Sequence, residues 1–164
     1  MENTPRIVER PDQPYAGITA SVTMQTIGEV LPPLVGEVFG WIEARGIAPA
    51  GAPFFRYHVI DMERELAVEA GVPVAAPVTG DERVRAGVLP AGRYAAVRHL
   101  GHYQGLVDAT GRLLRWGDEQ GLKWDMTQTA AGERWGARIE FYQNDPEEEP
   151  DPDKWLTELA FRLA

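Results

Sequence analysis

The residues best suited to chemistry lie in one short segment that alternates like a β-strand. Arg138, Glu140 and Tyr142 fall on one face of this strand, and the apolar residues between them fall on the other. If helices cover the apolar face, Glu140 and Tyr142 look into a groove. A carboxylate among aromatic rings is partly desolvated, which prepares it to accept a proton or to meet a cationic ligand. The alternative is a solvent-exposed Glu140, or one paired with Arg138, on an open sheet face.

Aromatic side chains could form the walls of such a groove. The chain has five tryptophans and five tyrosines. Tyr103 and Trp155 fall at the edges of predicted elements, where a ring can line a pocket while its polar tip stays hydrogen-bonded. Trp135 opens the strand that carries Glu140. We expect Tyr103, Trp135 and Trp155 to contribute to ligand binding, and plain core packing is the alternative.

The strand that begins at Phe54 leaves two orientations open. Either Phe55 and Tyr57 or Phe54 and His58 face the groove, because Tyr57 and His58 cannot do so together in a regular strand. A bulge would change this parity, so Tyr57 stays a candidate. His58 is the other candidate. If Arg56 corresponds to Arg138 in a duplicated unit, then His58 corresponds to Glu140.

Several reaction classes are disfavoured by what the sequence lacks. There is no cysteine, and the single serine, Ser21, lacks the flanking glycines of a nucleophile elbow. Gly-rich phosphate-binding loops are absent. His99 and His102 stand at a strand-to-helix junction without an adjacent carboxylate, which favours hydrogen bonding at a helix entry over metal binding. We expect no metal and no cofactor, so any catalysis must use carboxylate, phenol and water.

Charge and composition narrow the partners further. The 164 residues carry a net charge of −9, which argues against binding to nucleic acid or to an anionic membrane surface. Cationic or neutral ligands are favoured. The first residues show no secretory signal, and no apolar run approaches the ~20 residues of a membrane span. We therefore expect a cytoplasmic protein with one folded domain over residues 1–164; its oligomeric state is open.

The elements that position these residues follow from periodicity and turn signals. One helix is predicted to begin near Val30, because the two prolines after it suit only a first turn, and to stop at Gly46. A second helix has an apolar face from Leu106 onward and stops at Gly121. The predicted strands are Tyr15–Met24, Phe54–Ile60, Glu65–Val72, Val84–Leu89, Arg93–Leu100, Trp135–Tyr142 and Trp155–Leu163.

The two halves of the chain resemble each other. Trp41 and Trp116 precede their helix-stop glycines by the same spacing, and the segment at Glu65 echoes the segment at Glu158. Each half is strand, helix, strand, strand. We therefore predict an α+β fold of tandem duplicated βαββ (SHS2-like) units, about 14–73 and 84–164, that form an antiparallel sheet with both helices on one side. A ligand groove is expected where the halves meet.

Several segments together resemble the GyrI-like small-molecule-binding domains, which also serve as effector-binding domains of multidrug-responsive transcription activators. The resemblance covers about Tyr15 to the C-terminus. The segments that carry it are Leu89–Tyr94, His99–Tyr103, Val68–Pro73, Glu140–Tyr142 with Asp145-Pro146, and Trp155–Leu159.

This resemblance implies a groove for bulky aromatic, often cationic, compounds. It implies that Glu140 meets the ligand inside an aromatic cage to which Tyr57, Tyr103, Tyr142 and Trp155 contribute. The segment before Tyr15 is too short for a helix-turn-helix, which favours a stand-alone binder. One GyrI-like subfamily hydrolyses the cyclopropane of DNA-alkylating antibiotics, and here Glu140 and Tyr142 would be the catalytic pair. The alternatives are a non-catalytic drug-binding or sensing module and a protein inhibitor of DNA gyrase.

Overall fold

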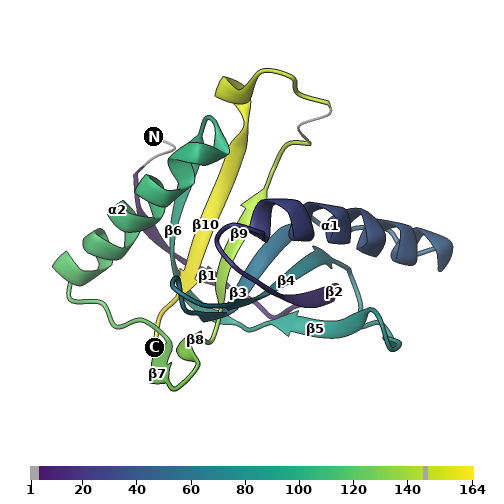
Figure 1. Cartoon of the computed structure of the whole chain (residues 1–164), viewed down its shortest axis with the longest axis horizontal. Helices are drawn as coiled ribbons and strands as arrows, with labels where there is room; N and C mark the ends of the chain where they lie inside the picture. The colour runs from purple at the N-terminus through teal and green to yellow at the C-terminus, as the bar shows by residue number, and fades with distance from the viewer. Residues whose placement is uncertain (1–3, 146–147) are drawn as a thin grey trace.

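The computed structural model describes residues 4–145 and 148–164, and in this part of the chain ten strands form one curled antiparallel sheet (Figure 1). The helical elements are α1 (Ile27–Ala44), η1 (Tyr103–Gly105), α2 (Leu106–Glu119) and η2 (Pro152–Lys154). The strands are β1 (Arg6–Arg10), β2 (Gln13–Val22), β3 (Phe54–Ile60), β4 (Leu66–Pro73), β5 (Arg85–Leu89), β6 (Gly92–Leu100), β7 (Met126–Thr129), β8 (Gly132–Trp135), β9 (Arg138–Tyr142) and β10 (Leu156–Arg162). The α+β class is as predicted.

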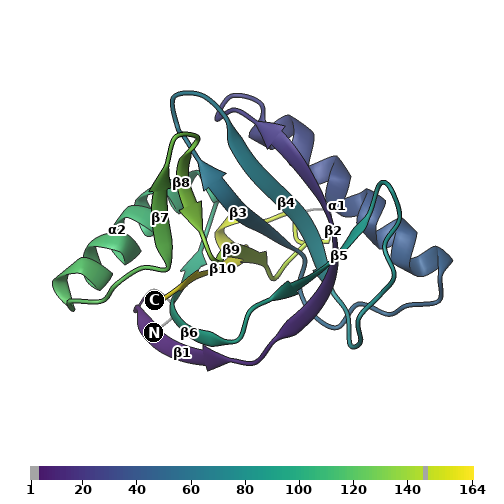
Figure 2. The ribbon, with the colours of Figure 1, turned by 90° about the horizontal axis from the view of Figure 1, so that it is seen from below.

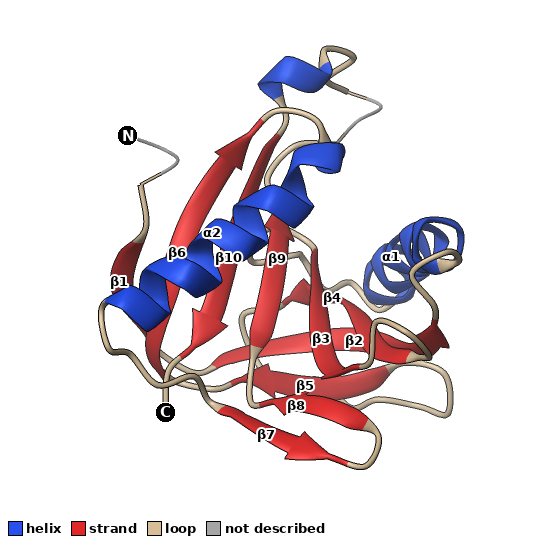
Figure 3. Ribbon diagram, turned by 60° about the vertical axis from the view of Figure 1, so that its left-hand side comes forward, coloured by secondary structure: helices blue, strands red, loops and turns tan. Residues whose placement is uncertain are grey.

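Both helices pack on the same face of the sheet (Figure 3). Their buried residues recur at three- and four-residue steps and join one hydrophobic core with side chains from the sheet. Each helix ends before a glycine in the left-handed region, Gly46 at φ 69° and Gly121 at φ 72°. The apolar stripes and stop glycines therefore predicted the existence of both helices and where each one ends. The buried helical residues are Leu31, Leu34, Val38 and Ile42 on α1 and Leu106, Ala109, Leu113 and Gly117 on α2.

A second hydrophobic core lies on the opposite face, and the sheet curls around it (Figure 2). It contains Tyr15, Phe54 and Tyr94, together with Ile139 and Phe141 of β9. Strand alternation divides β9 between the two faces, as predicted. The sequence led to the expectation that the helices cover the apolar face of this strand and leave Glu140 on the other face. This expectation is wrong, because the helices cover the face that carries Glu140.

The strand order is symmetric about the pairing of β3 with β9. The order of the strands is β1-β6-β10-β9-β3-β4-β2-β5. At its two ends, β1 of the first half pairs with β6 of the second half, and β5 of the second half pairs with β2 of the first half. Phe55 pairs with Glu140 across this central seam. In a two-fold relation about that pair, Phe55 corresponds to Glu140 and Tyr57 corresponds to Tyr142. His58 is therefore not the counterpart of Glu140.

The same relation matches residues in the outer strands. Glu69 pairs with Arg56 on β3, and Glu158 pairs with Phe141 on β9, so the two buried glutamates correspond to each other. The predicted echo between Glu65 and Glu158 was therefore four residues out of register. The repeat limits near 14–73 and 84–164 stay a prediction, and β1 lies before the first of them.

Several elements differ from the sequence prediction. Helix α1 begins at Ile27, one turn earlier than expected, because the Thr23–Thr26 turn supplies its first backbone hydrogen bonds and leaves the prolines inside the helix. The strand predicted from Trp135 is interrupted at Gly136, where a Cβ would overlap the carboxylate of Asp125. β1 and the β7–β8 hairpin were not predicted.

Candidate functional site

Glu140 lies on the face of the sheet that the helices cover. Its β10 partner, Leu159, is fully buried in the core beneath the helices. The phenol of Tyr57 donates to Glu140 Oε1 at 2.8 Å, and the phenol of Tyr142 donates to the same oxygen at 2.7 Å. Two strands of different halves thus converge on one carboxylate. Both hydrogen bonds use Oε1.

A row of aromatic rings extends from this carboxylate. Phe55 and Tyr142 meet edge to face at 4.8 Å between ring centroids, and Tyr103 meets Tyr142 at 5.6 Å. Tyr103 stacks on Trp155 at 4.6 Å with 29° between the planes. The indole of Trp155 donates to the backbone oxygen of Glu149 at 2.7 Å, which fixes its orientation. All four of these residues are partly exposed.

Arg138 adds a positive charge on the same face, two residues before Glu140. Its guanidinium is buried between the rings of Trp135 and Phe161, at 4.9 Å and 4.7 Å from their centroids. Its nearest carboxylate is Glu133, at 3.9 Å. The pairing of Arg138 with Glu140 that the sequence left open is therefore replaced by two phenol hydrogen bonds. Burial lowers the pKa of Arg138, and the charge of Glu140 opposes that shift.

The phenols beside Glu140 hold their protons firmly. Burial raises the pKa of Tyr57 and of Tyr142 well above the ordinary value, and the charge of Glu140 raises both further. Burial also raises the pKa of Tyr103, to which the charge of Asp145 contributes. At neutral pH Tyr57 and Tyr142 act as hydrogen-bond donors, and the carboxylate of Glu140 is the acceptor between them.

We predict that no tyrosine ionises at its ordinary pH in the folded protein. The pKa of Tyr15 and of Tyr94 is also raised by burial, so all five tyrosines share the direction. A raised folded-state pKa stabilises the native state below the unfolded pKa of about 10, and that stabilisation is lost as the pH rises toward the folded pKa. Absorbance at 295 nm should therefore rise at a higher pH in the folded protein than in the urea-unfolded protein. A reversible titration near pH 10 with native dichroism would contradict this.

Two residues predicted for the site lie elsewhere. His58 is the extra residue of a β-bulge after Tyr57 and points to the other face, where its Nε2 lies 2.8 Å from Glu69 Oε1. Trp135 is buried, and its ring packs against Trp124 and Phe161 in the core. Both fall outside the ring row because regular alternation from Phe55 already directs Tyr57 toward Glu140, and because the indole of Trp135 supports Arg138 instead.

The remaining predicted residues come together. Glu140, Tyr57, Tyr142, Tyr103 and Trp155 are joined by hydrogen bonds or ring contacts, which makes them the candidate site. Sequence reasoning left one ring unassigned, since Phe55 appeared only in one of the two parity alternatives. The pairing of β3 with β9, its counterpart in the second half, could have selected the orientation in which Phe55 and Tyr57 face the site.

His102 borders this row and also begins η1. Its Nδ1 accepts the backbone N–H of Gln104 at 3.0 Å, which is the helix-entry role that the sequence indicated. Its ring lies 5.4 Å from that of Trp155. Among residues 4–145 and 148–164, no group of three or more potential ligand side chains is arranged to hold a metal ion. In the same ranges, no helix is long and apolar enough to cross a membrane.

The chain thus has a curled sheet with two helices on one face, and a carboxylate among aromatic rings on that same face. The family model of the GyrI-like small-molecule-binding domain matches residues 3–164. The chain belongs to the GyrI-like family. A comparison with curated proteins finds no match.

Solved structures show the same fold. The C-terminal domain of EcmrR has a TM-score of 0.76 and 20% identity, over 98% of this chain and 97% of that one. The EcmrR chain in a DNA complex with RPo has a TM-score of 0.76 and 21% identity; 98% of this chain aligns, and it spans 57% of that longer chain. A hydrolase from Listeria innocua has a TM-score of 0.66 and 14% identity, over 99% and 93%. SAV2435 bound to tetraphenylphosphonium has a TM-score of 0.63 and 8% identity, over 98% and 94%.

Proposed function

We propose that the ring row around Glu140 binds a bulky aromatic cation. The observation that carries this proposal is the single carboxylate that two phenols of different halves hold in place, with stacked rings beside it. A cation is attracted both by the carboxylate and by the faces of the rings, and each attraction is stronger where water is partly excluded. The phenols cannot supply a competing positive charge, because they are neutral donors.

The ring row favours a flat or multi-ring ligand. Tyr103 and Trp155 are already stacked, so a further ring can extend the stack or replace one partner in it. Trp155 is held by its hydrogen bond to the backbone, which reduces the entropy that binding must overcome. That SAV2435, of the same fold, was solved with tetraphenylphosphonium supports the choice of ligand class.

A titration with two ions of equal shape and opposite charge tests the proposal. Tetraphenylphosphonium should bind with one-to-one stoichiometry and change the tryptophan fluorescence, whereas tetraphenylborate should bind at least ~10-fold more weakly, because the carboxylate repels it. The Trp155→Phe variant should abolish most of the fluorescence change and assign it to this indole. Equal affinity for the two ions would contradict a site built around Glu140.

The carboxylate and phenols also support a second function, the addition of water to a cyclopropane conjugated to a dienone. Glu140 would orient the water and take its proton as the oxygen attacks the strained carbon. The carbon–carbon bond breaks, its electron pair passes to the ring as a phenolate, and Tyr142 or Tyr57 donates a hydrogen bond to the new oxyanion. That oxyanion finally takes a proton from the medium, and Glu140 releases to the medium the proton that it took from water.

This second function predicts a product that is heavier by one water. Incubation with a cyclopropane-bearing alkylator and mass spectrometry would detect it, and Glu140→Gln should remove turnover while fluorescence still reports binding. An unchanged mass at saturating protein would exclude the hydrolysis and leave the binding proposal standing.

A further inference from the structure

We propose that the opposite face of the sheet holds a second small-molecule site, which takes a one- or two-ring aromatic carboxylate. A cavity of about 310 Å³ opens on the face of the second core. Leu89, Tyr94, Ile139 and Phe141 provide its apolar wall, and Arg10 and Glu158 provide its charged wall. This volume is at the lower end of ligand pockets, ~300–1,000 Å³, and suits a compact ligand.

The site is separate from the ring row around Glu140. Ile139 and Phe141 alternate along β9 with Glu140 and Tyr142, so the two sites lie on opposite faces of one strand. The sheet itself divides them.

Arginines surround the one carboxylate of the charged wall; Arg10 lines the cavity itself, and Arg6 and Arg98 approach Glu158 from outside its lining. The side chain of Glu158 is only 9% exposed and forms an ion pair with Arg10. The carboxylate also lies 3.8 Å from the guanidinium of Arg6 and 3.7 Å from that of Arg98. Three guanidinium groups thus surround one carboxylate. Although the whole chain is acidic, charges beyond about 10 Å are largely screened at 0.1 M salt, so the three arginines around Glu158 weigh more than the net charge, and Asp12 at the neighbouring turn offsets them only in part. This arrangement favours an anion.

Arg10 is the residue placed to meet that anion. Among the described residues its one hydrogen bond is from Nη2 to Glu158 Oε1, and its side chain is 29% exposed. The remaining N–H groups form a planar fork that suits a carboxylate. The guanidinium also lies 5.1 Å from the ring centroid of Phe141 and 5.9 Å from that of Tyr94. A carboxylate bound to Arg10 would therefore carry its ring into an aromatic wall.

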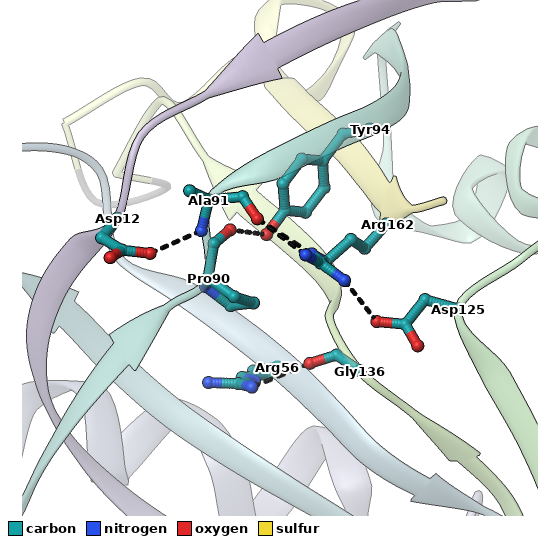
Figure 4. A network of polar contacts seen from close by, with 8 residues as sticks. All are labelled: Asp12, Arg56, Pro90, Ala91, Tyr94, Asp125, Gly136 and Arg162. Atoms are coloured by element: carbon teal, nitrogen blue, oxygen red, sulfur yellow. Dashed lines mark hydrogen bonds and ion pairs between the residues drawn. The ribbon is translucent and has the colours of Figure 1, made fainter. Parts of the chain in front are cut away.

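Hydrogen bonds fix the turn that contains the cavity-lining residue Pro90 (Figure 4). The backbone N–H of Ala91 donates to Asp12 at 2.6 Å, and Arg162 Nη2 donates to the Ala91 oxygen at 2.8 Å. The phenol of Tyr94 donates to the Pro90 oxygen at 2.6 Å. Because this turn is fixed before a ligand arrives, binding requires little further ordering.

Calorimetry with 1-naphthoate, and with 1-naphthalenemethanol as its neutral analogue, tests the site. Naphthoate should bind with one-to-one stoichiometry, and Arg10→Met, which keeps the apolar stem, should weaken it at least ~10-fold without changing the weak binding of the alcohol. Arg64→Met, at an exposed arginine on another loop, is the matched control and should bind as the wild type does. Saturating tetraphenylphosphonium should not displace naphthoate.

Three results would overturn the inference: no saturable naphthoate binding, wild-type affinity in Arg10→Met, or displacement by tetraphenylphosphonium. If circular dichroism shows that Arg10→Met does not fold, Ala52→Leu replaces it, because a larger side chain at this lining position fills part of the cavity. The same loss of naphthoate binding is expected, and retained affinity would contradict the site. The naphthoate titrations of the wild type and of the variants do not depend on whether the ring row binds a cation; only the competition experiment does.

Discussion

Glu140→Gln is expected to weaken the binding of tetraphenylphosphonium at least ~30-fold, about 2 kcal/mol, because it removes the negative charge that Tyr57 and Tyr142 hold beside the rings. Glutamine keeps a carbonyl oxygen that can accept from Tyr57 and Tyr142, so the geometry of the site should survive. Isothermal titration of the two proteins measures the loss.

The matched control for this change is charge removal elsewhere. Glu63→Gln lies on the exposed turn between β3 and β4, and we expect it to leave the affinity unchanged. Binding of tetraphenylborate should improve in Glu140→Gln, because the repulsion is gone. A variant that binds both ions like the wild type would remove Glu140 from the site.

Gly117→Ala is expected to destabilise the protein by about 1–3 kcal/mol, although alanine is the better helix former. A Cβ at Gly117 would lie 2.2 Å from Cζ2 of Trp124, and that indole packs against Trp135 and Phe161. The steric cost exceeds the ~1 kcal/mol that alanine gains in helix propensity. Since Trp135 and Phe161 hold Arg138, the disturbance should also reach the site.

Gly111→Ala on the same helix is the matched control. There a Cβ would lie 3.3 Å from Nη1 of Arg115, the end of a flexible side chain that can move aside. We expect this variant to be stabilised by up to ~1 kcal/mol. Urea denaturation of both proteins gives the free energies of unfolding. Stabilisation in both variants would show that Trp124 does not constrain Gly117.

Elements with strong local signals could be predicted from the sequence. The two helices, their stop glycines and the alternation of β9 follow from periods of 3.6 and 2 within the chain. β1 and the β7–β8 hairpin could not be predicted, because their residues are largely exposed and polar and their strand character comes from pairing with distant segments. Pairing of β1 with β6 is such a long-range effect.

The site was predictable residue by residue but not as an arrangement. Glu140 and Tyr142 share a face by alternation alone. That Tyr57 reaches the same carboxylate depends on the pairing of β3 with β9, and the position of the bulge at His58 depends on β4. A single strand pattern contains neither fact. For the same reason Trp135 could not be separated from the rings of the site before its packing in the core was known.

The most direct test of the site is a crystal structure of the complex with tetraphenylphosphonium. The ligand should lie on the helix-covered face of β9, with its phosphorus nearest to the carboxylate of Glu140 and a phenyl ring against Tyr103 or Trp155. Density for the ligand on the opposite face, among Ile139 and Phe141, with the ring row unoccupied, would contradict the proposal that Glu140 is the centre of the ligand site.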